Sequence, residues 1–139
     1  METWDAIRAR RNVRDYLDRP IDEGDLHRIL EAGWRSPSSR NEQPWGFVAV
    51  TDRHELQELS KVWRGAGHVA ISAATVALIA PEADSPEHTS SIRYDLGQAT
   101  LSMMVTAADL GIGSCHSSVA DQDLARKILG HPEIGRAHV

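Results

Sequence analysis

The chain has 139 residues, of which 41% are hydrophobic and 25% are charged, a balance typical of one globular domain rather than of a disordered chain. The net charge of −5 argues against a general nucleic-acid-binding protein, because phosphate contacts require a basic surface.

Apolar residues at helical spacing alternate with short apolar runs, and Ser, Thr or Asp at the start of the helical stretches indicates N-caps. The expected helices are one capped by Thr3, one over 23–34 capped by Asp22, one opened by Asp52, one over 92–110 followed by Gly111, and one from Asp121 to Gly130. The expected strands are 46–51, 75–80 and a third near 113–117, with polar loops over 36–44 and 82–91. This alternation predicts an α+β fold with helices around a small central mixed β-sheet.

The last six residues follow neither a helical nor a strand pattern. Residues 134–139, with the sequence IGRAHV, match the peptide that one reading frame of a common sequencing adapter encodes before a stop codon. We therefore expect a domain over 1–133, truncated at its C-terminal end, and a non-native tail over 134–139. The sheet of such a chain should be incomplete at one edge. A frayed natural terminus is the alternative.

The first candidate binding segment is 10–16, with the sequence RRNVRDY. Arginine offers a planar fork of donors that matches phosphate oxygens, and Asn12 can add a neutral hydrogen bond. In an extended chain, Arg10, Asn12 and Arg14 would project to one side, so the segment can bind one small anion. A solvated basic turn is the alternative, and this segment taken alone favours it.

Two further segments are rich in small polar residues or glycine. Residues 36–45, SPSSRNEQPW, form a rigid rim of donors that suits a flat heterocycle, although an ordinary connection with Trp45 as core filler is the alternative. Residues 111–118, GIGSCHSS, allow close backbone approach to a ligand, but they do not form a G-x-G-x-x-G motif. Cys115 is the one cysteine, so an intrachain disulfide is excluded, and neither a zinc cluster nor a Cys115–His116 catalytic pair is indicated.

Taken together, the three segments resemble the signatures of the FMN-dependent nitroreductase family in order and spacing. Residues 10–16 are similar to its Arg-Arg-Ser-x-Arg-x-Phe/Tyr motif, with Asn12 in place of the commoner serine. Residues 37–45 match Pro-Ser-Ser-x-Asn-x-Gln-Pro-Trp throughout, and 107–115 resemble Ala-x-x-Leu-Gly-Leu-Gly-Ser-Cys. The resemblance covers residues 2–132.

The resemblance implies an FMN enzyme built as an intertwined homodimer, with each flavin in the interface. One subunit would bind the phosphate, ribityl chain and pyrimidine edge through Arg10, Arg11, Asn12 and Arg14. The other subunit would reach the same flavin through Pro37, Ser38, Ser39 and Asn41. The backbone of His116, Ser117, Ser118 and Val119 would lie near the flavin ring, and Ser118-Val119 stands where some members have Glu-Gly.

The resemblance also implies an oxidoreductase in which hydride passes from NAD(P)H to flavin N5, and electrons then pass to a nitro compound, a quinone or a similar small acceptor. The flavin carries this chemistry, so no catalytic side chain is expected. The alternative is a non-catalytic dimeric binding or interaction module, or an inactive fragment, in which 8–14 would be a basic docking patch. The N-terminus lacks the pattern of a signal peptide and the apolar run 69–80 is too short to span a bilayer, so we expect a cytoplasmic protein.

Overall fold

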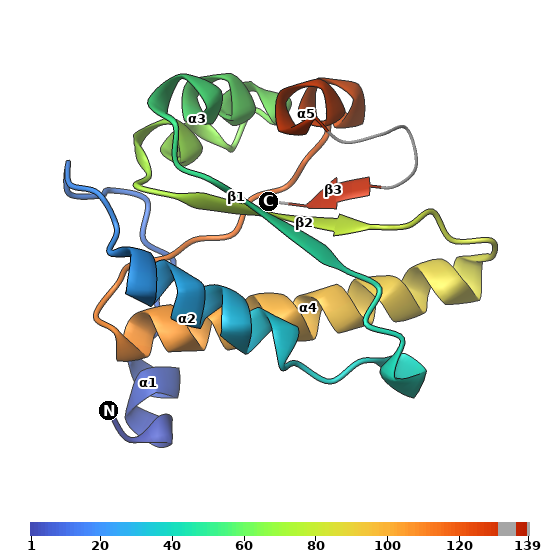
Figure 1. Cartoon of the computed structure of the whole chain (residues 1–139), viewed down its shortest axis with the longest axis horizontal. Coiled ribbons are helices and arrows are strands. Elements are labelled where there is room, and N and C mark those ends of the chain that lie inside the picture. Colours follow the sequence, from blue (N-terminus) through green and yellow to red (C-terminus); the bar gives the residue numbers. More distant parts are fainter. Residues whose placement is uncertain (131–135, 139) are drawn as a thin grey trace. The chain divides into compact units, whose positions relative to one another are not determined.

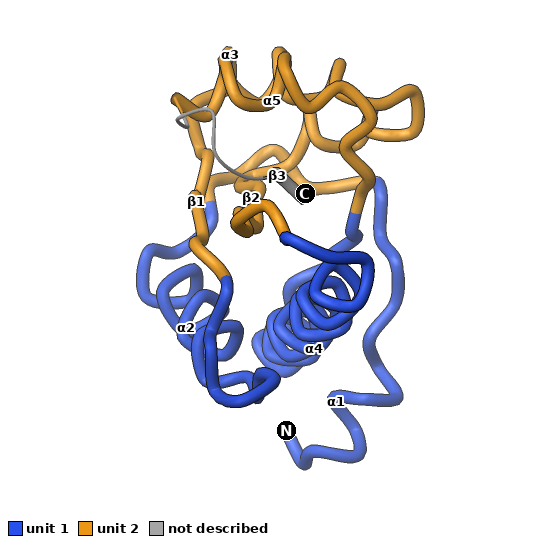
Figure 2. The backbone as a smooth tube through the Cα atoms, turned by 90° about the vertical axis from the view of Figure 1, so that its right-hand side faces the viewer, with its two compact units in different colours: residues 1–14, 21–44, 84–116 blue, residues 15–20, 45–83, 117–139 orange. Residues whose placement is uncertain are grey.

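The computed structural model describes residues 1–130 and 136–138. The chain forms two compact units, and each unit is assembled from three separate stretches of sequence (Figure 2). The first unit comprises 1–14, 21–44 and 84–116, and the second comprises 15–20, 45–83 and 117–139.

The first unit is helical. It contains α1 (Thr3–Ala9), α2 (Glu23–Trp34), the 3₁₀ helix η1 (Ser39–Asn41) and α4 (Pro86–Asp109). α2 lies along α4 (Figure 1). The buried apolar residues of α4 recur at helical spacing, which places them on one side of the helix. They are Ile92, Leu96, Ala99, Met103, Met104 and Ala107.

The starts of these helices follow the chemistry of their caps. Asp22 accepts hydrogen bonds from the backbone N–H groups of Gly24 and Asp25, as predicted. Thr3 is the first residue of α1 rather than its cap. The predicted loop over 82–91 is wrong from residue 86 onward, because Ser85 accepts from the His88 N–H at 3.1 Å and Pro86 opens α4.

The second unit is built on a three-stranded sheet in the order β1 (Gly46–Val50), β2 (Thr75–Ala80) and β3 (Arg136–His138). The first two strands confirm the predictions for 46–51 and 75–80. Both pairings in this sheet are antiparallel rather than mixed, and Val48 lies opposite Ala77 in the register of β1 and β2.

The third strand was predicted in the wrong place. Residues 113–117 do not join the sheet, since Ser114 forms only an isolated parallel bridge with Asn12. Residues 136–138 pair with β2 instead, although a tail without regular structure was predicted there. The unpaired backbone groups of a strand edge can bind any extended segment, whatever its side-chain pattern. The rest of the predicted tail lies outside the described residues.

Helices complete the second unit around a compact apolar cluster. They are α3 (Arg53–Leu59), the 3₁₀ helices η2 (Ser60–Val62) and η3 (Gly67–Ile71), and α5 (Gln122–Leu129). The cluster consists of Val50, Leu56, Leu59, Val62, Ala66, Val69 and Ala125. As predicted, Asp52 and Asp121 cap α3 and α5, and Gly130 ends α5 with φ of 61°. Helices and an antiparallel sheet together confirm the α+β class.

Candidate functional site

The arginine segment, residues 10–14, leaves α1 as an extended chain. Asn12 and Ser114 form a parallel β-bridge, and the Val13 N–H donates to the Ser114 carbonyl oxygen at 2.9 Å. This pairing brings together two segments that the sequence predicts to bind one ligand, although α2 and α4 separate them along the chain.

The side chains of the arginine segment divide into two groups. Arg11 Nη1 donates to the carbonyl oxygens of Arg8 and Arg10, so this guanidinium satisfies backbone acceptors at the end of α1. Arg10 Nη1 donates to Asn12 Oδ1 at 3.2 Å, and Asn12 and Arg14 are exposed. Arg10, Asn12 and Arg14 therefore offer a cationic, donor-rich surface to an anion.

The 37–41 loop is a tight turn with an unusual backbone. Arg40, Asn41 and Gln43 have φ of 55°, 57° and 51°, in the left-handed region that residues with a Cβ rarely adopt. Each such residue costs about 1–2 kcal/mol. Ser38 Oγ accepts from the Gln43 N–H at 2.9 Å, which closes the turn. Strain of this kind persists only where the surroundings hold it, and it occurs often at ligand sites.

A buried aspartate holds this loop, although it was not among the predicted site residues. Asp95 of α4 is 2% exposed. Its Oδ2 accepts from the Ser39 backbone N–H at 3.0 Å, and its Oδ1 accepts from Ser39 Oγ at 3.2 Å. Ser91 Oγ donates to Ser39 Oγ at 2.8 Å from one turn earlier in the helix. The sequence does contain a signal for a buried polar contact here, because position 95 lies among the apolar-periodic positions of the helix and carries an acid.

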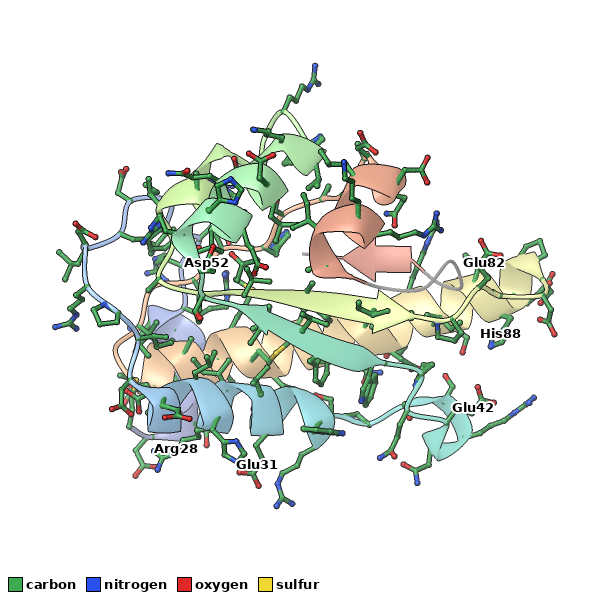
Figure 3. The ribbon with its side chains drawn as sticks, turned by 45° about the horizontal axis from the view of Figure 1, so that its top comes forward. Arg28, Glu31, Glu42, Asp52, Glu82 and His88 are labelled. Atoms are coloured by element: carbon green, nitrogen blue, oxygen red, sulfur yellow. The ribbon has the colours of Figure 1, made fainter. Side chains whose placement is uncertain are left out.

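A charged cluster lies where the same loop meets the start of α4. His88 Nδ1 lies 2.9 Å from Asp84 Oδ1, and His88 Nε2 lies 4.0 Å from Glu42 Oε2. Figure 3 shows Glu42, which directly follows the loop, and His88 on α4. The hydrogen bond with His88 lowers the pKa of the Asp84 carboxyl below its usual value.

The glycine-rich segment contributes backbone rather than charge. Gly111 has φ of 73°, and a Cβ built on Gly113 would lie 3.0 Å from Val13 Cβ, so glycine permits the close approach to the arginine segment. Cys115 is half-buried and its Sγ lies 3.3 Å from the His116 carbonyl oxygen. His116 is exposed at the end of the first unit.

Two predicted residues belong to the second unit. Ser117 is half-buried, with its Oγ 3.4 Å from the Ser118 carbonyl oxygen, and Ser118 is exposed. The second unit also contains a groove between residues 61–64 and 120–123. There the N–H groups of Ala120 and Asp121 both donate to the Val62 carbonyl oxygen. The groove is lined by Lys61, Val62, Trp63, Arg64, Ala120, Asp121, Gln122 and Asp123, and none of these was predicted as a site residue.

The loop and the arginine segment lie at different points along α4 (Figure 1). Asp95 contacts the loop, whereas Asp109 at the end of the helix pairs with the amino group of Met1 at 2.8 Å. A rise of 1.5 Å per residue separates Asp95 from Asp109 by about 21 Å along the helix axis. The arginine segment pairs with Ser114, beyond this end of the helix. One chain therefore does not bring these two predicted parts of the site together.

Comparison with known proteins identifies the class. The sequence profile of the nitroreductase family matches residues 7–77, half of the chain, including the arginine segment and the 37–41 loop. A provisionally named NADH dehydrogenase/NAD(P)H nitroreductase from Archaeoglobus fulgidus is 35% identical over 136 residues, which cover 95% of this chain and 78% of that protein. A 4-nitrobenzoate reductase from Nocardioides sp. is 41% identical over 65 residues, or 46% of this chain and 26% of that protein. The chain belongs to the nitroreductase family.

Solved structures share the fold. A provisionally named nitroreductase from Desulfovibrio desulfuricans, determined in complex with FMN, has a TM-score of 0.81 and 25% identity, covering 99% of this chain and 83% of that chain. An FMN-dependent nitroreductase from Clostridium difficile has a TM-score of 0.84 and 23% identity, covering 96% of this chain and 82% of that chain. The nitroreductase-like fold is thereby confirmed. Within residues 1–130 and 136–138, no helix combines the length and the apolar character needed to cross a membrane.

Proposed function

We propose that this protein is an FMN-dependent oxidoreductase that takes hydride from NAD(P)H and reduces a nitro compound, a quinone or a similar small acceptor. The family membership and the activities for which the relatives are named support an oxidoreductase. The bound FMN of the Desulfovibrio desulfuricans structure supports the choice of cofactor. FMN would supply the electron transfer, and the chain's residues would bind and orient it.

The observation that carries this proposal is the pairing of Asn12 with Ser114. It places an exposed, cationic segment beside a glycine-rich backbone within one unit. Guanidinium and carboxamide donors suit the phosphate and the polar chain of FMN. Arg10, Asn12 and Arg14 would hold this end of the cofactor, and Arg11 would support them through its hydrogen bonds to the backbone.

The second part of the proposed site is the 37–41 loop. Pro37 and Asn41 are exposed, while Ser38 and Ser39 are half-buried and hydrogen-bonded within the first unit. A fixed turn of this kind presents its polar groups without a further loss of conformational freedom on binding. The backbone N–H groups of 116–118 would contact the flavin ring system, and the binding domain would extend over 1–133.

The separation of the two parts supports a homodimer. The loop lies about 21 Å along α4 from the helix end near the arginine segment. A second copy would bring its own loop to the cofactor held by the first. Tyr94 and Leu101 of α4 are 70% and 55% exposed and lie seven residues apart on one helix face, which suits a subunit contact. A cytoplasmic location stays a prediction of the sequence.

The proposal is tested by purifying the chain and asking whether it carries flavin. We expect a yellow protein that releases FMN on denaturation and oxidises NADH or NADPH in proportion to an added nitroaromatic compound or quinone. A colourless protein that does not bind added FMN would contradict the proposal and favour the non-catalytic binding module. A yellow protein without turnover would keep the cofactor assignment and reject the activity of this chain.

A further inference from the structure

Asp95 is the one buried acid among the described residues, and it is not one of the proposed cofactor-binding residues. Burial of a carboxyl group is unfavourable unless donors compensate it. Here the donors are the Ser39 N–H and hydroxyl, with Gln98 Nε2 at 3.4 Å as a weaker third. Both close contacts thus go to a single residue of the proposed binding loop.

The loop needs such a partner because its own backbone is strained. Arg40 and Asn41 follow Ser39 directly with positive φ, and Gln43 repeats this conformation. The Ser38–Gln43 hydrogen bond closes the turn but does not attach it to the rest of the unit. The contacts from Asp95 and Ser91 to Ser39 attach the strained turn to the rigid helix α4.

We propose that Asp95 is a positioning residue, which holds Ser39 and thereby fixes the 37–41 loop in the conformation that binds the cofactor. The inference rests on the proposed function, because it takes FMN as the ligand of this loop. Asp95 acts through Ser39, so its effect on the cofactor is indirect. An aspartate suits this role because two acceptor oxygens on a short side chain can receive an N–H and a hydroxyl from the same residue.

The test is the Asp95→Asn variant of the full chain, which keeps the shape of the side chain but replaces one acceptor oxygen by a donor. Two readouts are needed, the Kd for FMN and the hydrogen-exchange rate of residues 38–43 in the FMN-free protein. We expect a Kd at least about tenfold higher, because a hydrogen bond to a charged group contributes about 1.5–3 kcal/mol and 1.4 kcal/mol is tenfold. We also expect faster exchange confined to the loop.

Two control variants separate positioning from charge and from general stability. Glu87→Gln removes an exposed acid from the first turn of α4, eight residues before Asp95, and should change neither readout. Met103→Ala removes a buried side chain of the same helix, and should lower the free energy of unfolding without raising the Kd of the folded protein.

A double variant tests the contact between Asp95 and Ser39. Ser39→Ala should weaken FMN binding in the wild-type background and have little further effect beside Asp95→Asn, since Asp95 and Ser39 act as one unit.

The outcomes are distinct. Unchanged loop exchange in Asp95→Asn overturns the positioning role, whatever the cofactor. Faster exchange with an unchanged Kd for FMN also overturns it, because the loop would then be irrelevant to the ligand. A wild-type chain that binds no FMN overturns the proposed function and this inference together, and the exchange data would still report whether Asp95 orders the loop. If Asp95→Asn does not fold, Ser91→Ala, which removes the other hydrogen bond from α4 to Ser39 Oγ, gives the same two readouts.

Discussion

Asn12 and Ser114 lie side by side in a parallel bridge, although they belong to segments at opposite ends of the first unit's sequence. The bridge makes the arginine segment and the glycine-rich backbone neighbours without making either part of the sheet. This arrangement is the basis for the predictions on cofactor binding.

Replacing Arg10 and Arg14 together by alanine should weaken FMN binding while the fold stays intact. Both side chains can donate to an anion, and neither belongs to the buried core. Loss of two charge-assisted hydrogen bonds of about 1.5–3 kcal/mol each should raise the Kd for FMN by roughly two to four powers of ten. Equilibrium dialysis measures this change. The matched control is Arg28→Ala with Arg93→Ala, two exposed arginines of α2 and α4, and an equal loss there would show that only net charge matters.

Replacing Gly113 by valine should separate the two bridged segments. A Cβ at this position already meets Val13 at 3.0 Å, so a branched side chain must push the arginine segment away. We expect weaker FMN binding and loss of hydrogen-exchange protection at the Val13 N–H, which donates to Ser114. Gly67→Ala is the control, because nothing lies within 4 Å of a Cβ there. A Gly113→Val variant with wild-type affinity would show that the bridge does not shape the site.

Replacing Leu59 by alanine should destabilise the protein without acting on the proposed site. Leu59 is 0% exposed in the apolar cluster of the second unit. Truncation of such a side chain costs about 2–5 kcal/mol through lost burial and the cavity left behind. Urea denaturation followed by circular dichroism measures this loss, and a change below about 1 kcal/mol would contradict the packing described for this cluster.

The free energy of unfolding at acidic pH should depend on His88. Because the pKa of Asp84 is lowered in the folded chain, its contribution to stability is present above the ordinary value of 3.8 and is lost as the pH falls through the lowered pKa. In His88→Gln, the Asp84 pKa should rise towards its ordinary value and this contribution should disappear. Carboxyl NMR titration measures the pKa, and an unchanged value would mean that the contact is not formed in solution.

Much of the fold could be predicted because caps and apolar periodicity are local signals. Asp22, Asp52 and Asp121 each mark the start of a helix. Each side chain accepts a hydrogen bond from a backbone N–H of the first turn, as an N-cap residue should. The start of α4 shows the limit of periodicity. Residues 86–91 carry no apolar pattern, and Ser85 with Pro86 set the boundary through capping alone.

Non-local relationships could not be predicted from the same signals. The pairing of β3 with β2 depends on an available strand edge, which leaves no trace in the sequence of 136–138. The role of Asp95 could be predicted only in part. An acid at an apolar-periodic position indicates a buried polar contact, but it does not identify the partner. Only the three-dimensional arrangement identifies that partner as Ser39.

Sedimentation velocity of the protein with FMN tests whether two copies share each cofactor. It is recorded over a range of dilutions, at a protein wavelength and at the visible flavin absorption. If each cofactor is held by the arginine segment of one copy and the 37–41 loop of another, flavin should sediment with the dimer and be released as the dimer dissociates. Added FMN should reciprocally tighten the dimer. A monomer that holds one FMN per chain at high dilution would contradict the shared site, and the assignment of the loop with it.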